Sequence, residues 1–495
     1  MGENYQFHDF GCAAFGTLKV KLSGAPGTVV TLEMGEVASG DRINQAPGGF
    51  RCYKSCQVTL DDRADNWYKF VIPPHTVPHY VKFTIPSPLD EEIACFRYAG
   101  VEGKCEVQEF RRREVYPRWD ERDAEFHCSD EQLNRIWEFC KYSTKATAAF
   151  GIFIDGERER CPYEGDTYIN QLGWFCCSAD PEIPRRTIDF FMDHSTWPIE
   201  WHLVMPLIVR DYLYYTGDTA SVSRWLPMLK ERLLDKLVRA DGLLAATEEL
   251  KELIDWPPWE RDGYESSGCS LVPNCYRYGA LLAMAELTGE ESYAVKAAQL
   301  KQVIREEMLK SHGFTDSPES SHQAQHSQFY PLFFHVAAPH EVDLSGCEIK
   351  CSVYGAQFLL DTLWSSGDAV QAVKLLKSDG LRSWQNMLNC GATITMEAWD
   401  DSLKENQDWN HAWGAAPANL IPRRLCGIRP TAPGFKTFTV DPQPAGIREF
   451  HLTVPTLHGK ITVDYVDKEV TVDFPAGLTA EFRGRQYTEK FTGKI

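Results

Sequence analysis

The sequence lacks the features that mark membrane-spanning and nucleic-acid-binding proteins. No stretch of its 495 residues approaches the roughly 18 uninterrupted apolar residues that span a bilayer, which excludes a transmembrane protein. No block of lysine and arginine offsets the formal net charge of −19. Because so acidic a surface repels phosphate groups, neither nucleic acid nor an anionic membrane is an expected partner.

Metal-binding and disulfide patterns are also missing. Sixteen cysteines are present, but they form no C-x-x-C pair and no Cys/His cluster of regular spacing. We therefore expect most of them to be reduced core thiols. No dense Asp/Asn/Gly loop of the calcium-binding type occurs, so we expect no cofactor and no essential metal.

The start of the sequence, MGENYQF, has neither a basic stretch nor an apolar run, so no signal peptide is visible. This favours a cytoplasmic location. The oligomeric state stays open, a homodimer included.

Hydrophobic alternation and turn residues divide the chain into segments. Residues 1–110 alternate as short strands do, at 17–22, 28–33 and 80–85, with glycine and proline between them. This spacing predicts an N-terminal antiparallel β-sandwich. A charged stretch, 111–127, is the predicted linker.

Helical spacing begins at residue 128, where Ser129-Asp130-Glu131-Gln132 has the form of a capping box. Helical patterns then recur at 201–215, 222–237, 276–287, 294–309 and 353–364. The segment 128–425 has room for about twelve helices, the number in a ring of six hairpins, and shows no open-solenoid repeat. Residues 426–495 alternate again and predict a second β-sandwich.

Two loops carry the residues that suit chemistry. The first, the acidic loop (residues 155–166), packs five carboxylates and two arginines between apolar flanks. It is either a loop dipping into a polar cavity or a solvated loop with internal ion pairs. The second, the 393–401 loop, places Glu397 among Met396, Ala398 and Trp399, which is either a desolvated carboxylate or a surface acid beside a core tryptophan.

Aromatic residues near these loops fit a sugar site or a core. His411 lies between two tryptophans, and proline stiffens the loop that carries Trp256 and Trp259. Trp201 lies in a helical pattern, so we expect it in the core. Glycoside hydrolysis needs one carboxylic acid to protonate the leaving oxygen and a second carboxylate across the sugar ring. Two carboxylate loops rich in aromatics meet that need, although many proteins hold two acidic loops.

At these loops the sequence resembles the α-L-rhamnosidases of glycoside hydrolase family 78. The N-terminal stretches 9–11, 27–37 and 96–101, the acidic loop, and the stretch 393–435 with Asn410-His411 and Gly427-Ile428-Arg429-Pro430 carry the resemblance. The resemblance implies an (α/α)6 barrel between an N-terminal and a C-terminal β-sandwich. It also implies an inverting exo-glycosidase that removes terminal α-L-rhamnose or a similar neutral sugar.

The resemblance also implies roles for residues. Glu159 matches the general acid and Glu397 the general base that activates water. Substrate-binding positions are assigned to Asp155, Arg158, Asp166, Tyr163, Trp256, Trp259, Trp399 and His411. We expect the two glutamate carboxyls to face one cavity, about 6.5–9.5 Å apart as in inverting enzymes, with Trp256 or Trp259 lining it.

The acidic loop departs from the family pattern in two places. Cys161-Pro162 follows Glu159-Arg160 instead of standing soon after the first aspartate, and Tyr163 stands near the place of a tryptophan. These differences leave the sugar open. Two other interpretations remain at this point. One is another six-hairpin glycosidase or a polysaccharide lyase, and the other is a catalytically idle sugar-binding homologue.

Overall fold

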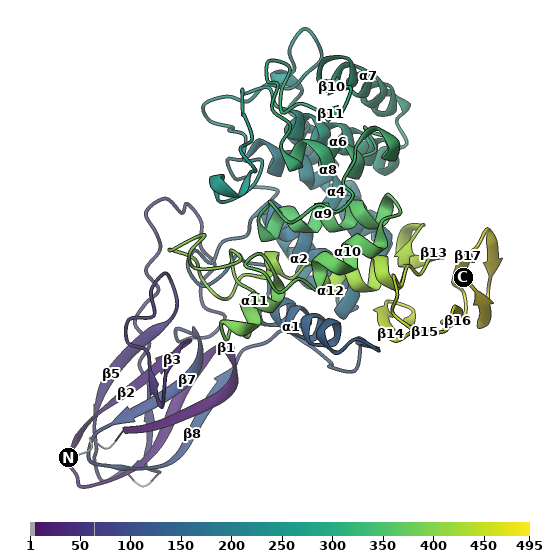
Figure 1. Cartoon of the computed structure of the whole chain (residues 1–495). Helices are drawn as coiled ribbons and strands as arrows, with labels where there is room; N and C mark the ends of the chain where they lie inside the picture. The colour runs from purple at the N-terminus through teal and green to yellow at the C-terminus, as the bar shows by residue number, and fades with distance from the viewer. Residues whose placement is uncertain (1–4, 64) are drawn as a thin grey trace.

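The computed structural model describes residues 5–63 and 65–495, which form a β-rich N-terminal domain, a helical middle region and a C-terminal β domain (Figure 1). This order is the one that hydrophobic periodicity predicts. Among the described residues, no helix combines the length and the apolar character that crossing a membrane requires. All sixteen cysteines carry free thiols, and ten of them are buried.

The N-terminal domain contains a six-stranded sheet in the order β5-β2-β7-β1-β6, with β8 also paired to β1. Alternate residues of the central strands, such as Leu18, Val20, Leu32 and Met34, fill its core. The strands are β1 (Tyr5–Ser23), β2 (Val29–Gly35), β5 (Tyr53–Thr59), β6 (Trp67–Lys69), β7 (Ala94–Glu102) and β8 (Glu106–Glu114), and the short pair β3 (Ala38–Ser39) and β4 (Arg42–Ile43) lies beside them.

Two sequence predictions in this region are wrong. The alternating stretch 80–85 is not a strand but part of an irregular segment between β6 and β7. Prolines flank this stretch and remove backbone donors that a sheet would need, and the Ile85 N–H bonds the Arg160 carbonyl instead, at 2.7 Å. The linker is also shorter than 111–127, because β8 continues to Glu114 and β9 (Glu125–Cys128) pairs with β14.

The predicted helical stretches lie in helices except at two ends: residues 233–237 lie beyond a helix that ends at Arg232 and finish in a short 3-10 turn at Asp235–Leu237, and Leu309 begins the two-residue strand β10 (Leu309–Lys310). The helices are α1 (Glu131–Thr147), α2 (Glu164–Cys177), α3 (Glu182–Phe190), α4 (Ile199–Thr216), α5 (Thr219–Arg232), α6 (Leu271–Thr288), α7 (Glu291–Met308), α8 (Gln325–Phe333), α9 (Val353–Ser365), α10 (Ala369–Leu376), α11 (Trp384–Asn389) and α12 (Pro417–Leu420). The N-cap of α1 is Asp130, whose carboxylate accepts from the N–H groups of Gln132 and Leu133; the expected cap Ser129 lies one residue too early.

Burial separates two kinds of helix. Every residue of α2 is buried, and α4, α6 and α9 are buried nearly all round, whereas α7 buries only one stripe. The buried helices pack in succession: α2 on α4, α4 on α6, α6 on α8, α8 on α9, α9 on α12, and α12 back on α2. The contacts therefore return to the helix at which they began.

The C-terminal domain pairs its strands in two sheets, ordered β12-β13-β17-β18 and β19-β16-β15-β14-β9. Strand β9 precedes α1 in the sequence, whereas its neighbour β14 follows the last helix. In sequence, the helical region is therefore inserted between two paired strands of one sheet. The strands are β12 (Ile428–Pro430), β13 (Thr437–Val440), β14 (Glu449–Thr456), β15 (Gly459–Val466), β16 (Glu469–Asp473), β17 (Thr479–Phe482), β18 (Arg485–Tyr487) and β19 (Phe491–Lys494).

Candidate active site

The acidic loop runs between α1 and the first turn of α2, and it is buried. Asp155, Glu157, Arg158, Glu159 and Arg160 each expose 8 % or less of their surface, which excludes a solvated loop. The Asp155 N–H donates to the Cys161 carbonyl and the Cys161 N–H to Asp155 Oδ1, both at 3.0 Å. These two bonds close the loop, so the side chains between them project in fixed directions.

Some of the loop's charges face the N-terminal domain. The Arg160 guanidinium donates to Glu92 and to the Ile93 carbonyl, each at 2.7 Å. The Glu157 carboxylate accepts from the Cys95 N–H at 2.9 Å, and burial raises the pKa of this carboxyl. These residues fasten the acidic loop to the β domain.

The other charges face a cavity of about 450 Å³, a size that suits a small ligand. It brings together eight of the sequence-predicted site residues: Asp155, Arg158, Glu159, Tyr163, Asp166, Trp256, Glu397 and His411. The acidic loop and the 393–401 loop therefore meet at one place, although more than 200 residues separate them in the sequence.

One guanidinium contacts both glutamates. Arg158 Nη1 and Nη2 each lie 2.7 Å from an oxygen of Glu397, and its Nε and Nη2 lie 3.2 and 3.1 Å from Glu159 Oε1. Nearby carboxylates, Glu397 first, raise the pKa of Arg158 against the opposing effect of burial. Two carboxylates thus occupy adjacent edges of one permanently charged, planar group.

The two glutamates differ in their remaining partners. Lys404 Nζ lies 3.2 Å from Glu397 Oε2, so this carboxylate contacts two buried cations. Glu159 instead accepts hydrogen bonds from two phenols, Tyr80 at 3.0 Å on Oε1 and Tyr163 on Oε2. Neither Lys404 nor Tyr80 is among the residues that the sequence predicts for the site.

His411 joins two further carboxylates. Its Nδ1 lies 3.1 Å from Asp408 Oδ1 and its Nε2 lies 2.8 Å from Asp166 Oδ1. Although burial alone would lower it, these bonds raise the pKa of His411 well above its ordinary value, and the bond to His411 lowers the pKa of Asp408 to about 2. The ring is therefore an imidazolium that donates to both carboxylates.

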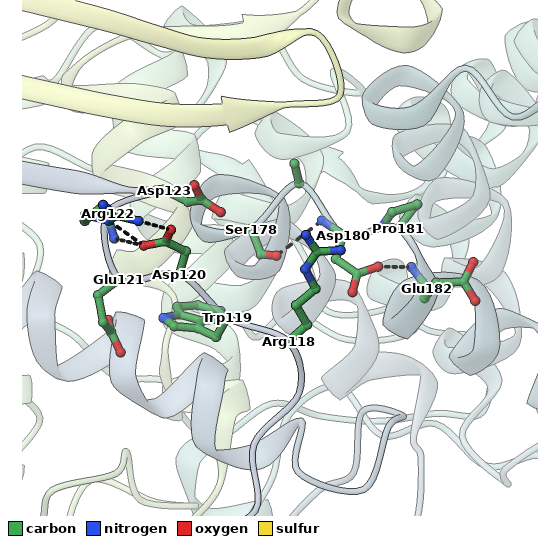
Figure 2. Close-up of a pocket in the computed structure, with 11 residues that line it drawn as sticks. Arg118, Trp119, Asp120, Glu121, Arg122, Asp123, Ser178, Asp180, Pro181 and Glu182 are labelled. Carbon is green, nitrogen blue, oxygen red and sulfur yellow. Dashed lines mark hydrogen bonds and ion pairs between the residues drawn. The ribbon is translucent and has the colours of Figure 1, made fainter.

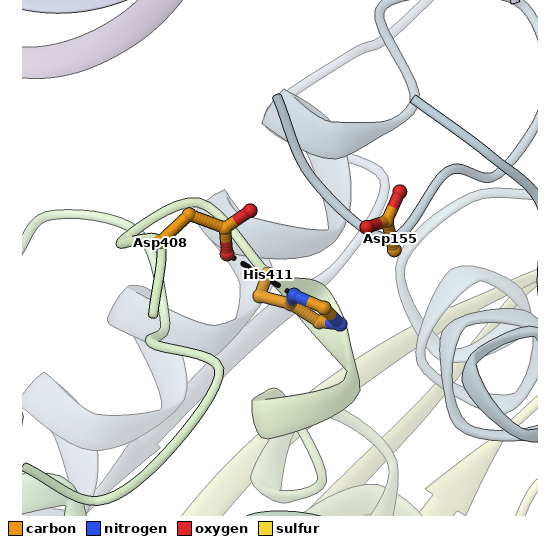
Figure 3. A group of neighbouring side chains, drawn as sticks. All are labelled: Asp155, Asp408 and His411. Carbon is orange, nitrogen blue, oxygen red and sulfur yellow. Dashed lines mark hydrogen bonds and ion pairs between the residues drawn. The ribbon is translucent and has the colours of Figure 1, made fainter. Parts of the chain in front are cut away.

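Asp155, Asp408 and His411 also come close enough to be considered as metal ligands (Figure 3). The donor chemistry does not favour a cation, because each nitrogen of His411 already has a carboxylate oxygen within hydrogen-bond distance. Burial, followed by the charge of Glu159, raises the pKa of Asp155 well above its ordinary value. Its Oδ2 is buried and without a partner among the described residues, so a neutral Asp155 can present a donor to a ligand hydroxyl.

The structure corrects two tryptophan predictions, those for Trp399 and Trp259. Trp399 does not reach the cavity; it is fully buried, donates to the Cys351 carbonyl at 2.9 Å and packs edge-on against Trp384. Trp259 is 63 % exposed and bonds the Leu403 carbonyl, outside the cavity lining. Trp201 is buried in the core, as expected, and it also borders the cavity, where its ring faces Tyr163 at a ring distance of 5.5 Å.

Sequence reasoning missed several residues that line the cavity: Tyr80, Trp197, Leu253, Lys404, Asn406 and Trp413. Trp413 is one of the two tryptophans that flank His411, so its proximity was visible in the sequence. Tyr80 lies in a stretch whose alternation resembles a strand, and nothing in its neighbours marks it.

A larger cavity, of about 1100 Å³, lies elsewhere, between residues 118–123 and 178–182 (Figure 2). Its charges are paired locally: the Arg122 guanidinium bonds Asp120 at 2.8 Å, and Asp180 accepts from the Glu182 N–H at 2.9 Å. None of the predicted site residues borders it. Size alone therefore does not identify the functional site.

Two carboxylates that face one small cavity meet the chemical requirement for acid–base cleavage of a glycosidic bond. Residues 121–425 match the bacterial alpha-L-rhamnosidase 6 hairpin glycosidase domain, and residues 427–483 match the bacterial alpha-L-rhamnosidase C-terminal domain. The chain therefore belongs to the bacterial alpha-L-rhamnosidase family, which confirms the resemblance seen in the motifs.

Individual relatives agree with this family. An alpha-L-rhamnosidase of Alteromonas sp. (strain LOR) is 28 % identical over 146 residues, which are 27 % of this chain and 16 % of that protein. The GH78 rhamnosidase of Bacillus sp. GL1 has a TM-score of 0.74 at 20 % identity and covers 97 % of this chain and 54 % of its own. The Streptomyces avermitilis alpha-L-rhamnosidase complexed with L-rhamnose has a TM-score of 0.76 at 17 % identity, covering 97 % and 48 %. This chain thus spans about half the length of these structures, and the likeness concerns the fold.

Proposed function

We propose that this chain is an inverting exo-glycosidase that releases terminal α-L-rhamnose, with Glu159 as general acid and Glu397 as general base. The observation that carries the proposal is the contact of both glutamates with Arg158 at the wall of one cavity. Family membership supports rhamnose as the sugar, and a cavity volume of about 450 Å³ suits one terminal sugar unit.

The positions of the carboxylates support inversion. They bind adjacent edges of the Arg158 guanidinium, Glu397 through Nη1 and Nη2 and Glu159 through Nε and Nη2. In inverting enzymes the two carboxyl groups lie about 6.5–9.5 Å apart, which leaves room for a water, and two carboxylates on separate edges of one guanidinium suit that arrangement. Retaining enzymes hold the pair at about 5 Å.

The remaining partners support the division of roles. A general base must be ionised, and Glu397 contacts the cations Arg158 and Lys404. A general acid must carry a proton, and Glu159 contacts two neutral phenols and one cation, Arg158. Binding of the sugar hydroxyls is assigned to Asp155, Arg158, Asp166 and Tyr163, with His411 holding Asp166 at the cavity and Trp256 as an apolar wall.

The architecture completes the proposal. Because α2, α4, α6, α8, α9 and α12 pack in a closed succession, we propose that they form the inner ring of an (α/α)6 barrel, flanked by β-sandwich domains. The acidic loop leads into α2, so it lies at one end of that ring.

A screen of nitrophenyl glycosides, α-L-rhamnoside included, tests the activity, and NMR of the first-formed product tests the stereochemistry. We expect turnover of the α-L-rhamnoside with initial release of β-L-rhamnose. Release of the α-anomer would reject inversion. Turnover of another sugar alone would favour another six-hairpin glycosidase.

A further inference from the structure

An irregular segment of the N-terminal domain, residues 71–92, crosses to the acidic loop; we call it the docking segment. Thr84 Oγ1 donates to the Glu159 carbonyl at 3.0 Å, and the Ile85 N–H donates to the Arg160 carbonyl at 2.7 Å. The Phe83 ring packs edge-on against His194, with 4.2 Å between the ring centroids. Main-chain and side-chain contacts thus fix the docking segment beside Glu159.

These contacts carry Tyr80 into the cavity. Its hydroxyl lies 3.0 Å from Glu159 Oε1, while 53 % of the residue stays exposed at the cavity. Burial of the phenol, followed by the charge of Glu159, raises the pKa of Tyr80 to about 12. Tyr80 therefore keeps its proton at neutral pH and donates it in the hydrogen bond.

The donors around Glu159 are unequal on its two oxygens. Oε1 accepts from Arg158 and Tyr80, whereas within the described part of the chain Oε2 contacts only the Tyr163 hydroxyl. Asp155 and Asp166 are the neighbouring carboxyls that repel charge on Glu159. Because Oε1 is already occupied by two donors, a proton on Glu159 is directed to Oε2.

We propose that Tyr80 is a positioning residue for Glu159, supplied by the N-terminal domain, which holds Oε1 and so presents the acidic proton on Oε2 to the leaving oxygen. This inference rests on the proposed role of Glu159 as general acid. It makes the N-terminal β domain a structural part of the active site.

Tyr80→Phe removes the hydroxyl and leaves the ring. Tyr53→Phe is the matched control, because Tyr53 also donates to a carboxylate of the same domain, Glu33, at 2.7 Å, outside the cavity lining. We expect Tyr80→Phe to lower kcat at least tenfold on an alkyl or sugar glycoside, which needs protonation, and less than threefold on a dinitrophenyl glycoside. KM and the thermal midpoint should stay close to those of the wild type, and Tyr53→Phe should leave both activities unchanged.

The substrate pair is built on whichever sugar the wild type turns over best, so the test does not depend on rhamnose. Equal losses on both substrates, or none on either, would overturn the role of Tyr80 while leaving the proposed hydrolase intact. A wild type inactive on every glycoside would reject the proposed function and this inference together. The alkaline limb of the pH–rate profile reports ionisation of the general acid. It should shift along the pH axis in Tyr80→Phe and keep its wild-type position in Tyr53→Phe.

Discussion

At the scale of residues, the two glutamates differ in their neighbours rather than in their burial. Glu159 and Glu397 are 6 % and 2 % exposed, yet one contacts phenols and the other a second cation. Their proposed roles follow from this difference, and substitution can separate them.

Glu159→Gln removes the proton donor and keeps the shape of the side chain. We expect it to reduce kcat on alkyl and sugar rhamnosides by about 10²–10⁴-fold and to affect activated aryl rhamnosides far less, since their leaving groups need little protonation. Glu397→Gln should impair both kinds of substrate. Added azide should then restore turnover and give a glycosyl azide of inverted configuration. The opposite pattern in the two variants would exchange the roles.

His411→Gln should destabilise the protein in a pH-dependent manner. The pKa of His411 is raised in the folded state, so its stabilisation is fully present below the unfolded value of about 6.5 and is lost as pH rises through the folded pKa. The pKa of Asp408 is lowered to about 2, so its share is lost as pH falls from about 4 towards 2. Removing one partner of such a buried pair costs about 3–5 kcal/mol.

Thermal midpoints across pH 4–9 check this expectation. The difference in thermal midpoint between the wild type and His411→Gln should be largest between pH 5 and 6.5 and should decrease as pH rises further. The exposed pair His451–Asp464 offers a control, and His451→Gln should show a gap close to zero at every pH. A constant gap for His411→Gln would mean that the ring is not charged in the folded protein.

Residues found by sequence reasoning were those with a chemical signature. The charge density of the acidic loop and the setting of His411 between tryptophans both pointed to the cavity. Helical periodicity placed Trp201 in the core correctly, but Trp399 could not be placed, because its position beside Glu397 in the sequence does not show which space its ring faces. Lys404 and Tyr80 are single polar residues in irregular segments, where a side chain's direction depends on tertiary contacts.

At the scale of elements, two adjacent residues at the start of α1 are candidate N-caps, and they differ in the hydrogen bonds that they accept. Asp130 accepts from the Gln132 and Leu133 N–H groups, whereas Ser129 Oγ accepts only from the Arg448 N–H at 3.3 Å. Asp130→Ala should therefore lower the free energy of unfolding by about 1 kcal/mol, and Ser129→Ala by much less. Urea unfolding followed by circular dichroism measures both.

Asp130 also forms an ion pair with Lys377, so a second variant isolates the cap. Asp130→Asn keeps a carbonyl oxygen for the α1 N–H groups and loses the charge. It should retain most of the stability if capping dominates. A loss equal to that of Asp130→Ala would assign the effect to the ion pair instead.

The elements were predictable where one face of a periodic segment is buried. The alternating stretches within β1 and β2 have this property, and so do the helical patterns of α5 and α7. The stretch 80–85 alternates equally well but has no partner strand, because the Ile85 N–H and the Thr84 hydroxyl bond the acidic loop. Local pattern cannot reveal such a partner, since it lies about 75 residues further along the chain.

At the scale of the whole molecule, the order of β, helical and β regions follows from the change in period along the chain. The closed succession of buried helices does not, because the contact of α12 with α2 joins residues about 250 positions apart. Nor does the junction with the N-terminal domain, where the acidic loop is fastened by Arg160. This residue is 1 % exposed and bonds Glu92 and the Ile93 carbonyl.

Arg160→Gln tests how far the N-terminal domain supports the site. The variant leaves the partly buried Glu92 carboxylate and the buried Ile93 carbonyl without their guanidinium partner, and a buried acceptor left unsatisfied costs about 1–3 kcal/mol. Because the acidic loop as a whole would then shift, we expect kcat to fall by a similar factor on activated and on poor leaving groups, together with a lower thermal midpoint. Arg63→Gln, which breaks an exposed pair with Asp61 in the same domain, should change neither quantity. A normal kcat with a lower midpoint would show that the domain stabilises the molecule without shaping the active site, whereas loss of both would make the domain junction part of the catalytic structure.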